Sequence, residues 1–225
     1  MSPERKELPS SRRGYFIVLE GGEGTGKSTQ LRRLAAWLAE RGVPHCVARE
    51  PGGTPVGEGI RDLLLERKAL RMPAETELLL MLAARAAFVR EVVEPALDRG
   101  EVMLSDRFET STFVYQGIAR GLGLDRTRML NRFATGGLEP DIVLVLDLPV
   151  DEGIARRRRE GRGEDRIEAE GSAFLERVRD GYREVAISDP RAVLVDGAGE
   201  LDEVQGRILE LLGRRFPELF GAGEG

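Results

Sequence analysis

Cysteine and histidine are almost missing from this sequence, and each shortage excludes a class of site. The 225 residues include one cysteine, Cys46, and one histidine, His45. A single thiol excludes an intrachain disulfide and a zinc site built from several cysteines, and a single imidazole excludes a histidine-rich metal site. Both residues lie in a short stretch with the composition of a strand, so we interpret them as packing residues.

Long apolar runs and an excess of positive charge are missing as well. The longest apolar stretches, such as residues 78–84, are too short to cross a bilayer, and the polar N-terminus lacks the apolar region of a signal peptide. The net charge is -5, whereas a dedicated nucleic-acid-binding protein usually carries an excess of lysine and arginine. We therefore expect a cytoplasmic protein with no membrane and no nucleic-acid partner.

The overall composition is that of an ordinary globular chain, with 41% hydrophobic and 32% charged residues. A chain of 225 residues is expected to form one domain, here over residues 14–216. Residues 1–13 and 217–225 are expected to be loose tails.

Residues 21–28 read Gly-Gly-Glu-Gly-Thr-Gly-Lys-Ser, the pattern of a phosphate-binding loop. An apolar stretch precedes the loop and a helical pattern follows it. The glycines let backbone N–H groups turn toward phosphates, and the N-terminus of the helix attracts the same anion. Lys27 can reach the β- and γ-phosphates, and the Ser28 hydroxyl can bind Mg²⁺. We therefore expect ATP or another nucleoside triphosphate to bind at Gly21, Gly22, Glu23, Gly24, Thr25, Gly26, Lys27, Ser28 and Thr29.

Strand-like and helix-like segments alternate along the chain. This order predicts an α/β fold with a doubly wound, parallel five-stranded sheet flanked by helices, of the P-loop NTPase type. Pro95 is expected to kink or end the longest helical pattern. The expected strands are 15–19, 45–48, 101–104, 142–146 and 192–195, and the expected helices are 29–38, 56–65, 75–99, 111–119, 126–133, 150–159, 174–187 and 201–212.

In such a sheet the ligand site lies beyond the carboxyl ends of the strands. Arg49 follows the second expected strand, and Asp106 and Arg107 follow the third. Asp106 is placed to hold Mg²⁺ directly or through water, and the two arginines could grip a second phosphate. A surface ion pair is an equal alternative for either arginine alone. Together these residues suit phosphoryl transfer, in which the protein positions groups and neutralises charge.

Six arginines lie among glycines and acidic residues at positions 156–166. Such a segment could be a solvated helix end, a nucleic-acid patch, or a mobile lid that brings an arginine to the transferring phosphoryl group. The neighbouring acidic residues and the negative net charge disfavour nucleic acid. We favour a short lid at about 156–168 over a solvated face.

Four segments carry a resemblance to a known family. They are Glu-Gly-Gly-Glu-Gly-Thr-Gly-Lys-Ser-Thr-Gln at 20–30, Arg-Glu-Pro-Gly-Gly-Thr at 49–54, Asp-Arg-Phe at 106–108 followed by Ser-Thr-Phe-Val-Tyr-Gln-Gly at 111–117, and Asp-Arg-Ile-Glu at 165–168. With them, nearly the whole chain, from Phe16 to about Ile208, resembles the bacterial thymidylate kinases, which are P-loop nucleoside monophosphate kinases. The phosphate loop is shared by many enzymes, but the second and third segments in one chain are specific.

The resemblance implies that ATP, with Mg²⁺, phosphorylates thymidine 5′-monophosphate (dTMP) to the diphosphate (dTDP) in dTTP biosynthesis. It also implies a homodimer formed through helices, which residues 75–93 could supply. Catalysis would rest on Lys27, Arg107, Glu23 and an arginine of the lid. For the acceptor, Glu23 would accept a hydrogen bond from the 3′-OH, Arg49 and Arg107 would hold the monophosphate, Arg85, Thr112 and Gln116 would read the thymine edge, and Tyr115 would press on C2′ and disfavour ribonucleotides.

Two positions depart from the family pattern. Met81 stands where the family usually has a phenylalanine that stacks on thymine, and a thioether packs on a ring less specifically than a phenyl group. The lid sequence at 162–166 is one residue tighter than usual. The catalytic arginine is therefore open among Arg159, Arg162 and Arg166, and we favour Arg162.

Three alternatives compete with this interpretation. A regulatory GTPase shares the phosphate loop but normally reads guanine through Asn-Lys-x-Asp, and the only asparagine here, Asn131, precedes Arg132. A non-enzymatic binding module would predict a damaged site, whereas the lysine and serine of the loop are intact. A kinase for another nucleoside monophosphate or a deoxynucleoside is the serious alternative, because Met81 weakens the assignment of the base.

Overall fold

The computed structural model describes residues 13–66, 70–161, 166–167 and 170–221. Its five strands form one parallel sheet in the order β2-β3-β1-β4-β5, which confirms the predicted fold class. The strands are β1 (Tyr15–Gly21), β2 (His45–Arg49), β3 (Val102–Asp106), β4 (Ile142–Asp147) and β5 (Ala192–Asp196). β1 and β4 are buried along nearly their whole length, as expected for strands covered on both faces.

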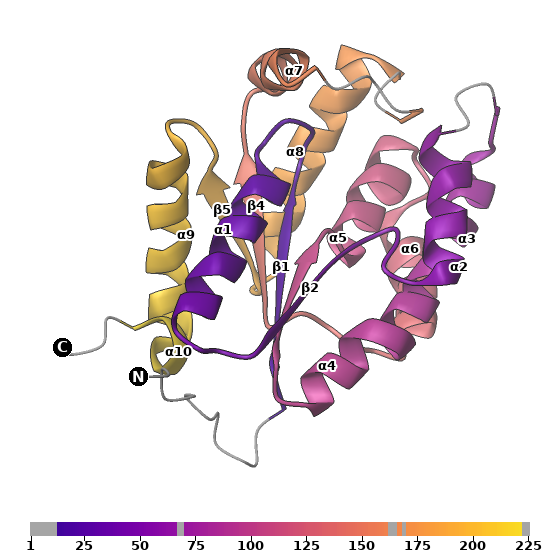
Figure 1. Cartoon of the computed structure of the whole chain (residues 1–225). Helices are drawn as coiled ribbons and strands as arrows, with labels where there is room; N and C mark the ends of the chain where they lie inside the picture. Colours follow the sequence, from indigo (N-terminus) through magenta and orange to yellow (C-terminus); the bar gives the residue numbers. More distant parts are fainter. Residues whose placement is uncertain (1–12, 67–69, 162–165, 168–169, 222–225) are drawn as a thin grey trace.

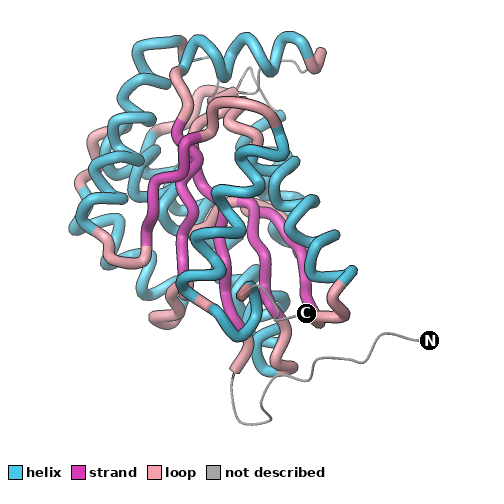
Figure 2. Tube along the Cα trace, turned by 90° about the vertical axis from the view of Figure 1, so that its left-hand side faces the viewer, coloured by secondary structure: helices cyan, strands magenta, loops and turns pink. Residues whose placement is uncertain are grey.

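Helices cover both faces of this sheet, and Figure 2 shows the strands side by side through the middle of the molecule. On one face, α1 (Lys27–Glu40) and α9 (Leu201–Arg215) pack Leu34 and Ile208 against the strands. In Figure 1 these two helices lie on the left, and α3 and α6 lie on the right. The remaining elements are α2 (Pro55–Arg61), η1 (Asp62–Glu66), α3 (Ala74–Phe88), η2 (Val89–Val93), α4 (Glu94–Asp98), α5 (Glu109–Thr112), η3 (Phe113–Ala119), α6 (Leu124–Thr135), α7 (Val150–Arg159), α8 (Ser172–Ser188) and α10 (Pro217–Phe220), where η marks a π-helical turn.

The long helical pattern at 75–99 is divided into α3, η2 and α4. Pro95 is the second residue of α4, which follows the π-helical turn without a break. The π-helical turn η2 joins the two α-helical parts and buries Val89 and Val93 in the core. Pro95 therefore marks a change of helix, as the sequence predicts. No helix in the described residues is both long and apolar enough to span a membrane.

The C-terminal segment differs from the prediction. Residues 217–220, expected to be part of a loose tail, form α10, so the predicted boundary at 216 is wrong. Leu219 and Phe220 are buried, and the Phe220 ring stacks on Trp37 of α1 with centroids 5.2 Å apart. Two adjacent apolar residues carry too little periodicity to indicate this contact from the sequence.

The register of the strands assembles the site. Arg49 at the end of β2 pairs with Asp106 of β3, which pairs in turn with Leu19 of β1. The phosphate loop that follows β1 therefore meets Arg49 and Asp106 at one edge of the sheet.

Candidate active site

The phosphate loop between β1 and α1 depends on glycine for its shape. Gly21, Gly24 and Gly26 have φ angles of 135°, 70° and 93°, which residues with a Cβ rarely adopt. Gly24 also lies against Gly153 of α7, where an added Cβ would come within 2.1 Å of the Gly153 carbonyl oxygen. The start of α7 therefore packs on the loop, a contact that the loop sequence alone does not indicate.

Lys27 is folded back onto this loop. Its Nζ donates hydrogen bonds to the carbonyl oxygens of Gly21 and Gly22 at 3.1 and 2.7 Å, and the Thr25 hydroxyl donates to Gly22 at 3.0 Å. Burial and the nearby Arg107 guanidinium lower the pKa of Lys27 from its ordinary value. The ammonium group is thus buried beside the backbone that would surround a phosphate.

Ser28 and Asp106 form the predicted metal-binding pair. The Ser28 hydroxyl donates to Asp106 Oδ2 at 2.6 Å. A hydroxyl and a carboxylate side by side are oxygen donors that suit Mg²⁺, which is usually held by one or two protein groups together with substrate phosphates. In the described part of the chain, no three His, Cys, Asp or Glu residues cluster into a protein-only metal cage. The fit is therefore to an ion that arrives with a nucleotide.

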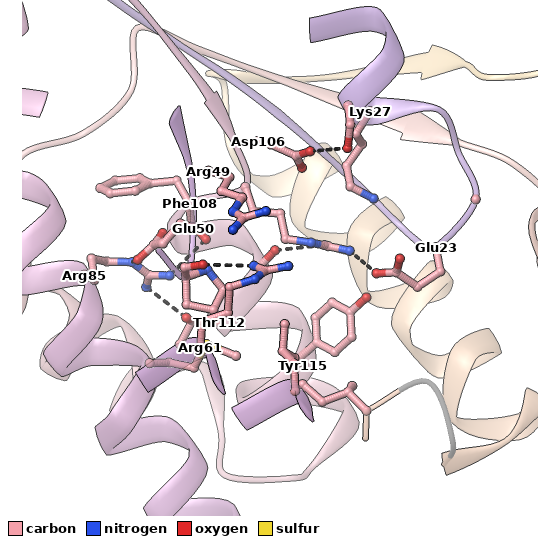
Figure 3. Close-up of a pocket in the computed structure, with 18 of the residues that line it drawn as sticks. Glu23, Lys27, Arg49, Glu50, Arg61, Arg85, Asp106, Phe108, Thr112 and Tyr115 are labelled. Carbon is pink, nitrogen blue, oxygen red and sulfur yellow. Dashed lines mark hydrogen bonds and ion pairs between the residues drawn. The ribbon is translucent and has the colours of Figure 1, made fainter. Parts of the chain in front are cut away.

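A cavity of about 310 Å³ adjoins the phosphate loop (Figure 3). Gly24, Gly26 and Lys27 of the loop line this cavity, whereas Gly21, Gly22 and Thr25 do not. The phosphate loop and the other residues around the cavity therefore form one continuous site. Further lining residues are Glu23, Ser28, Thr29, Arg49, Met81, Arg85, Asp106, Arg107, Thr112, Tyr115 and Gln116, which include every predicted substrate-binding residue.

Arg107 is constrained by its backbone conformation and by several hydrogen bonds. Its φ is 74°, a left-handed backbone conformation that is uncommon for a residue with a side chain. Its guanidinium donates to the Gly21 carbonyl at 3.1 Å, to Tyr182 at 2.9 Å and to the Glu23 carboxylate. The group thus contacts the phosphate loop and also lines the cavity.

Arg49 and Arg61 are two further arginines that line the cavity. Arg49 donates to Glu58 Oε2 at 3.1 Å, so the surface ion pair weighed from the sequence is present, while the side chain still faces the cavity. Arg61 donates to the Pro51 carbonyl at 2.9 Å and also lines the cavity. Burial, followed by the charge of Arg49, lowers the pKa of Arg61. Arg61 was not predicted as a site residue, because no motif marks it.

Arg85 is the centre of a buried polar network and is only 2% exposed. Its Nε donates to Glu50 at 2.7 Å, and one terminal nitrogen donates to both Thr112 and Asn131 at 2.8 Å. The other donates to the Phe108 carbonyl at 3.1 Å. Burial raises the pKa of Glu50 to about 7, against the opposing effect of Arg85. Asn131 is thereby committed inside the fold rather than available to read guanine.

A second buried network surrounds Glu77 of α3. The Gln116 amide nitrogen donates to Glu77 Oε1 at 2.9 Å, and Arg120 donates to both carboxylate oxygens. Arg166 donates to Glu77 Oε2 and, at 2.7 Å, to the Leu64 carbonyl. Gln116 reaches the cavity wall from this cluster, while Arg166 is anchored away from the phosphate loop.

The three candidate lid arginines are in different situations. Arg159 ends α7 and is exposed, with a hydrogen bond of 3.4 Å to the Ala155 carbonyl. Arg162, the favoured candidate, lies outside the described residues, as does part of the expected lid. Arg166 is 8% exposed and ion-paired with Glu77, so it does not face the site in this conformation.

Two buried residues that shape the site were not predicted as site residues. Glu20, at the end of β1, accepts hydrogen bonds from the backbone of Phe108 and Ser111 and from the Tyr182 hydroxyl. Tyr182 of α8 in turn contacts Arg107. Only burial could have indicated Glu20 from the sequence, because a carboxylate in a buried strand needs several hydrogen-bond donors. The sequence does not say which donors they are.

Comparisons with known proteins agree with this geometry. The sequence model of the Thymidylate kinase family matches residues 19–208. Thymidylate kinase of Pseudomonas savastanoi pv. phaseolicola is 51% identical over 200 residues, which are 88% of this chain and 95% of that protein. Its counterpart in Pseudomonas syringae pv. tomato is 50% identical over 207 residues, covering 92% and 96%.

The fold is also similar to a solved structure. The crystal structure of thymidylate kinase from Ehrlichia chaffeensis superposes with a TM-score of 0.72 at 28% sequence identity, covering 89% of this chain and 99% of that one. The family match spans most of the chain and includes the phosphate loop and every residue that lines the cavity. The chain belongs to the thymidylate kinase family.

Proposed function

We propose that this protein transfers the γ-phosphoryl group of ATP to dTMP and so produces dTDP. The observation that carries the proposal is the continuity of the phosphate loop with a cavity whose far wall is polar and buried. Asp106 and Arg107, adjacent in the chain, both line this cavity and both contact the phosphate loop, through Ser28 and Gly21. Phosphoryl transfer needs such an arrangement, because the two phosphates must approach in line while their charge is neutralised.

Each predicted residue has a role in this proposal. Lys27 would leave the loop carbonyls for the β- and γ-phosphates of ATP, and Ser28 and Asp106 would hold Mg²⁺. When bound, the ion neutralises charge on the transferring phosphate. Arg49 and Arg107 would hold the monophosphate of dTMP. The residues for the sugar and the base are those that the family pattern implies: Glu23 for the 3′-OH, Tyr115 for C2′, Met81 for the ring face, and Arg85, Thr112 and Gln116 for the thymine edge.

The catalytic arginine of the lid is proposed to be Arg162, with Arg159 as the alternative. The anchoring of Arg166 by Glu77 and Leu64 argues against a third candidate. Replacing Arg162 by Ala should lower kcat strongly at saturating substrate, while Arg159→Ala should change it little. The reverse order would move the role to Arg159.

The reaction is tested by measuring ADP formation with ATP, Mg²⁺ and a panel of nucleoside monophosphates. A strong preference for dTMP is expected, with Lys27→Ala as the control for contaminating kinases. A preference for another base would keep the kinase chemistry but would refute dTMP as the acceptor. This second candidate is supported by Met81, which takes the place of the aromatic ring in the family pattern.

We also propose a homodimer formed through α3 and the neighbouring α6. These helices pack together through Leu78, Leu82 and Ala134, yet Leu79 is 59% and Phe133 is 88% exposed. Large exposed apolar side chains on adjoining helices favour a protein interface. Sedimentation should show a dimer for the native chain and a shift toward monomer for Phe133→Glu. A cytoplasmic location stays a prediction from the sequence.

A further inference from the structure

Glu77 determines which way the Gln116 amide points. Glu77 is 1% exposed, and its Oε1 accepts the Gln116 amide nitrogen at 2.9 Å. Burial alone would raise the pKa of Glu77, but hydrogen bonds from Arg166 and Gln116 hold it below its ordinary value. An ionised carboxylate has no proton to donate. The Gln116 nitrogen must therefore face Glu77, and the Gln116 oxygen is the atom left for the cavity.

The cavity wall beside the Gln116 oxygen, which accepts hydrogen bonds, carries a group that donates them. Arg85 and Gln116 both line the cavity, and the Arg85 guanidinium can only donate hydrogen bonds. The Glu77 contact therefore makes this part of the wall a donor from Arg85 beside an acceptor from Gln116. If the Gln116 amide were flipped, both groups would present donors.

This pattern distinguishes the two common pyrimidines. Thymine carries an acceptor at O4 and, next to it, a donor at N3–H. Cytosine carries an amino donor at C4 and an acceptor at N3. A wall with a donor beside an acceptor is complementary to thymine and opposed to cytosine at both positions.

We propose that Glu77 is a positioning residue for base specificity: it locks the Gln116 amide in the orientation that accepts thymine N3–H. The inference rests on the proposed function, because it assumes that the cavity takes a pyrimidine monophosphate. The base would contact Gln116, and Gln116 contacts Glu77, so base specificity depends on a carboxylate that does not itself line the cavity. Binding sites built from fixed donors and acceptors reject mismatched ligands strongly, because a mismatch leaves buried polar groups unpaired.

The decisive variant is Glu77→Gln. Arg120 and Arg166 both donate to the Oε2 position, whereas the only arginine contact with Oε1 is the longer one from Arg120 Nε at 3.3 Å, so the new amide keeps its oxygen at the Oε2 position and turns its NH₂ group toward Gln116. Gln116 must then offer its oxygen to that NH₂ group and its nitrogen to the cavity. We expect the ratio of kcat/KM for dTMP to that for dCMP to fall at least roughly tenfold, mainly through a higher KM for dTMP. The KM for ATP should not change.

Arg120→Met is the matched control. It removes two hydrogen bonds from Glu77 but leaves the carboxylate facing Gln116, and Arg120 does not line the cavity. This variant should lower the melting temperature while keeping the dTMP to dCMP ratio of the native protein. An equal fall of the ratio in both variants would show a general structural effect and would overturn the inference. An unchanged ratio in a folded Glu77→Gln protein would also overturn it.

A second variant covers the case in which Glu77→Gln does not fold. Gln116→Leu removes the amide itself, so its dTMP to dCMP ratio should fall at least as far. If that ratio stayed native, Gln116 would read no base and Glu77 would have nothing to orient. Failure of the proposed function would look different, because the native protein would then not prefer dTMP at all.

Discussion

Replacing Arg85 by Met tests how the buried charge of the site is balanced. The guanidinium is 2% exposed and donates to Glu50, Thr112, Asn131 and the Phe108 carbonyl. Removing one partner of a buried ion pair typically costs about 3–5 kcal/mol, because the other charge is left uncompensated. Methionine fills a similar length without donating, so the loss should come from unpaired polar groups rather than from a large cavity.

The cost should depend on pH through Glu50. Its pKa in the folded protein is raised to about 7 from 4.5. The folded state therefore binds more protons than the unfolded state between these values, and the contribution of Glu50 to stability is lost as the pH rises through 7. Without Arg85 the pKa of Glu50 rises further. Each additional pKa unit lowers the free energy of unfolding by about 1.4 kcal/mol at pH values above the new pKa.

We therefore expect Arg85→Met to lower the free energy of unfolding by about 3 kcal/mol at pH 6, where Glu50 is mostly protonated and the loss comes from buried acceptors left without a donor. At pH 8.5 the loss should be larger by at least about 1.4 kcal/mol. Urea denaturation of the native protein and the variant at pH 6 and at pH 8.5 measures the two losses of free energy. Adding Glu50→Gln should recover part of the loss at pH 8.5 and remove its pH dependence. Arg214→Met, which breaks an exposed pair with Glu210, should have no measurable effect.

Two results would refute this reasoning. An equal loss at pH 6 and pH 8.5 would mean that Glu50 is not the group left uncompensated. A double variant less stable than Arg85→Met alone would mean that the Glu50 carboxylate is stabilised by groups other than Arg85.

Three further predictions concern the proposed reaction. Arg107→Ala should weaken dTMP binding far more than ATP binding, and equal losses in two separate titrations would contradict its assignment to the acceptor phosphate. Asp106→Asn should raise the Mg²⁺ concentration needed for half-maximal rate at least roughly tenfold, because a charged oxygen is lost from the pair with Ser28; an unchanged requirement would place the ion elsewhere. Tyr115→Phe should keep the preference for deoxyribose while Tyr115→Ala relaxes it, and a native ratio of dTMP to ribothymidine monophosphate rates in the Ala variant would exclude a steric role.

The parts of the fold that local sequence encodes could be predicted. Buried β-branched runs and the glycine pattern of residues 21–28 need only near neighbours to be recognised, so the five strands and the phosphate loop lie where they were expected. The charged residues at the ends of β2 and β3 lie side by side, as expected for a parallel sheet.

Contacts between distant residues could not be predicted in the same way. Arg85 finds its partners 23 to 46 residues away, and Glu77 meets Arg166 across 89 residues. Nothing in the local pattern distinguishes these buried groups from those on a solvated helix face. The lid arginines show the same limit, since the sequence places Arg166 beside Arg162 but does not show that a glutamate of α3 holds it.

The stacking of α10 on α1 has a practical consequence for spectroscopy. Trp37 is the only tryptophan of the chain, and it lies between the Phe220 ring and the Arg41 guanidinium, 3.8 Å from the ring centroid. It sits near the end of the helix whose first residue is Lys27, far along the helix axis from the phosphate loop. Intrinsic fluorescence should therefore follow the detachment of the C-terminal helix and the loss of the core, and should be nearly silent to nucleotide binding. An optical signal for the site itself requires a fluorophore on the nucleotide.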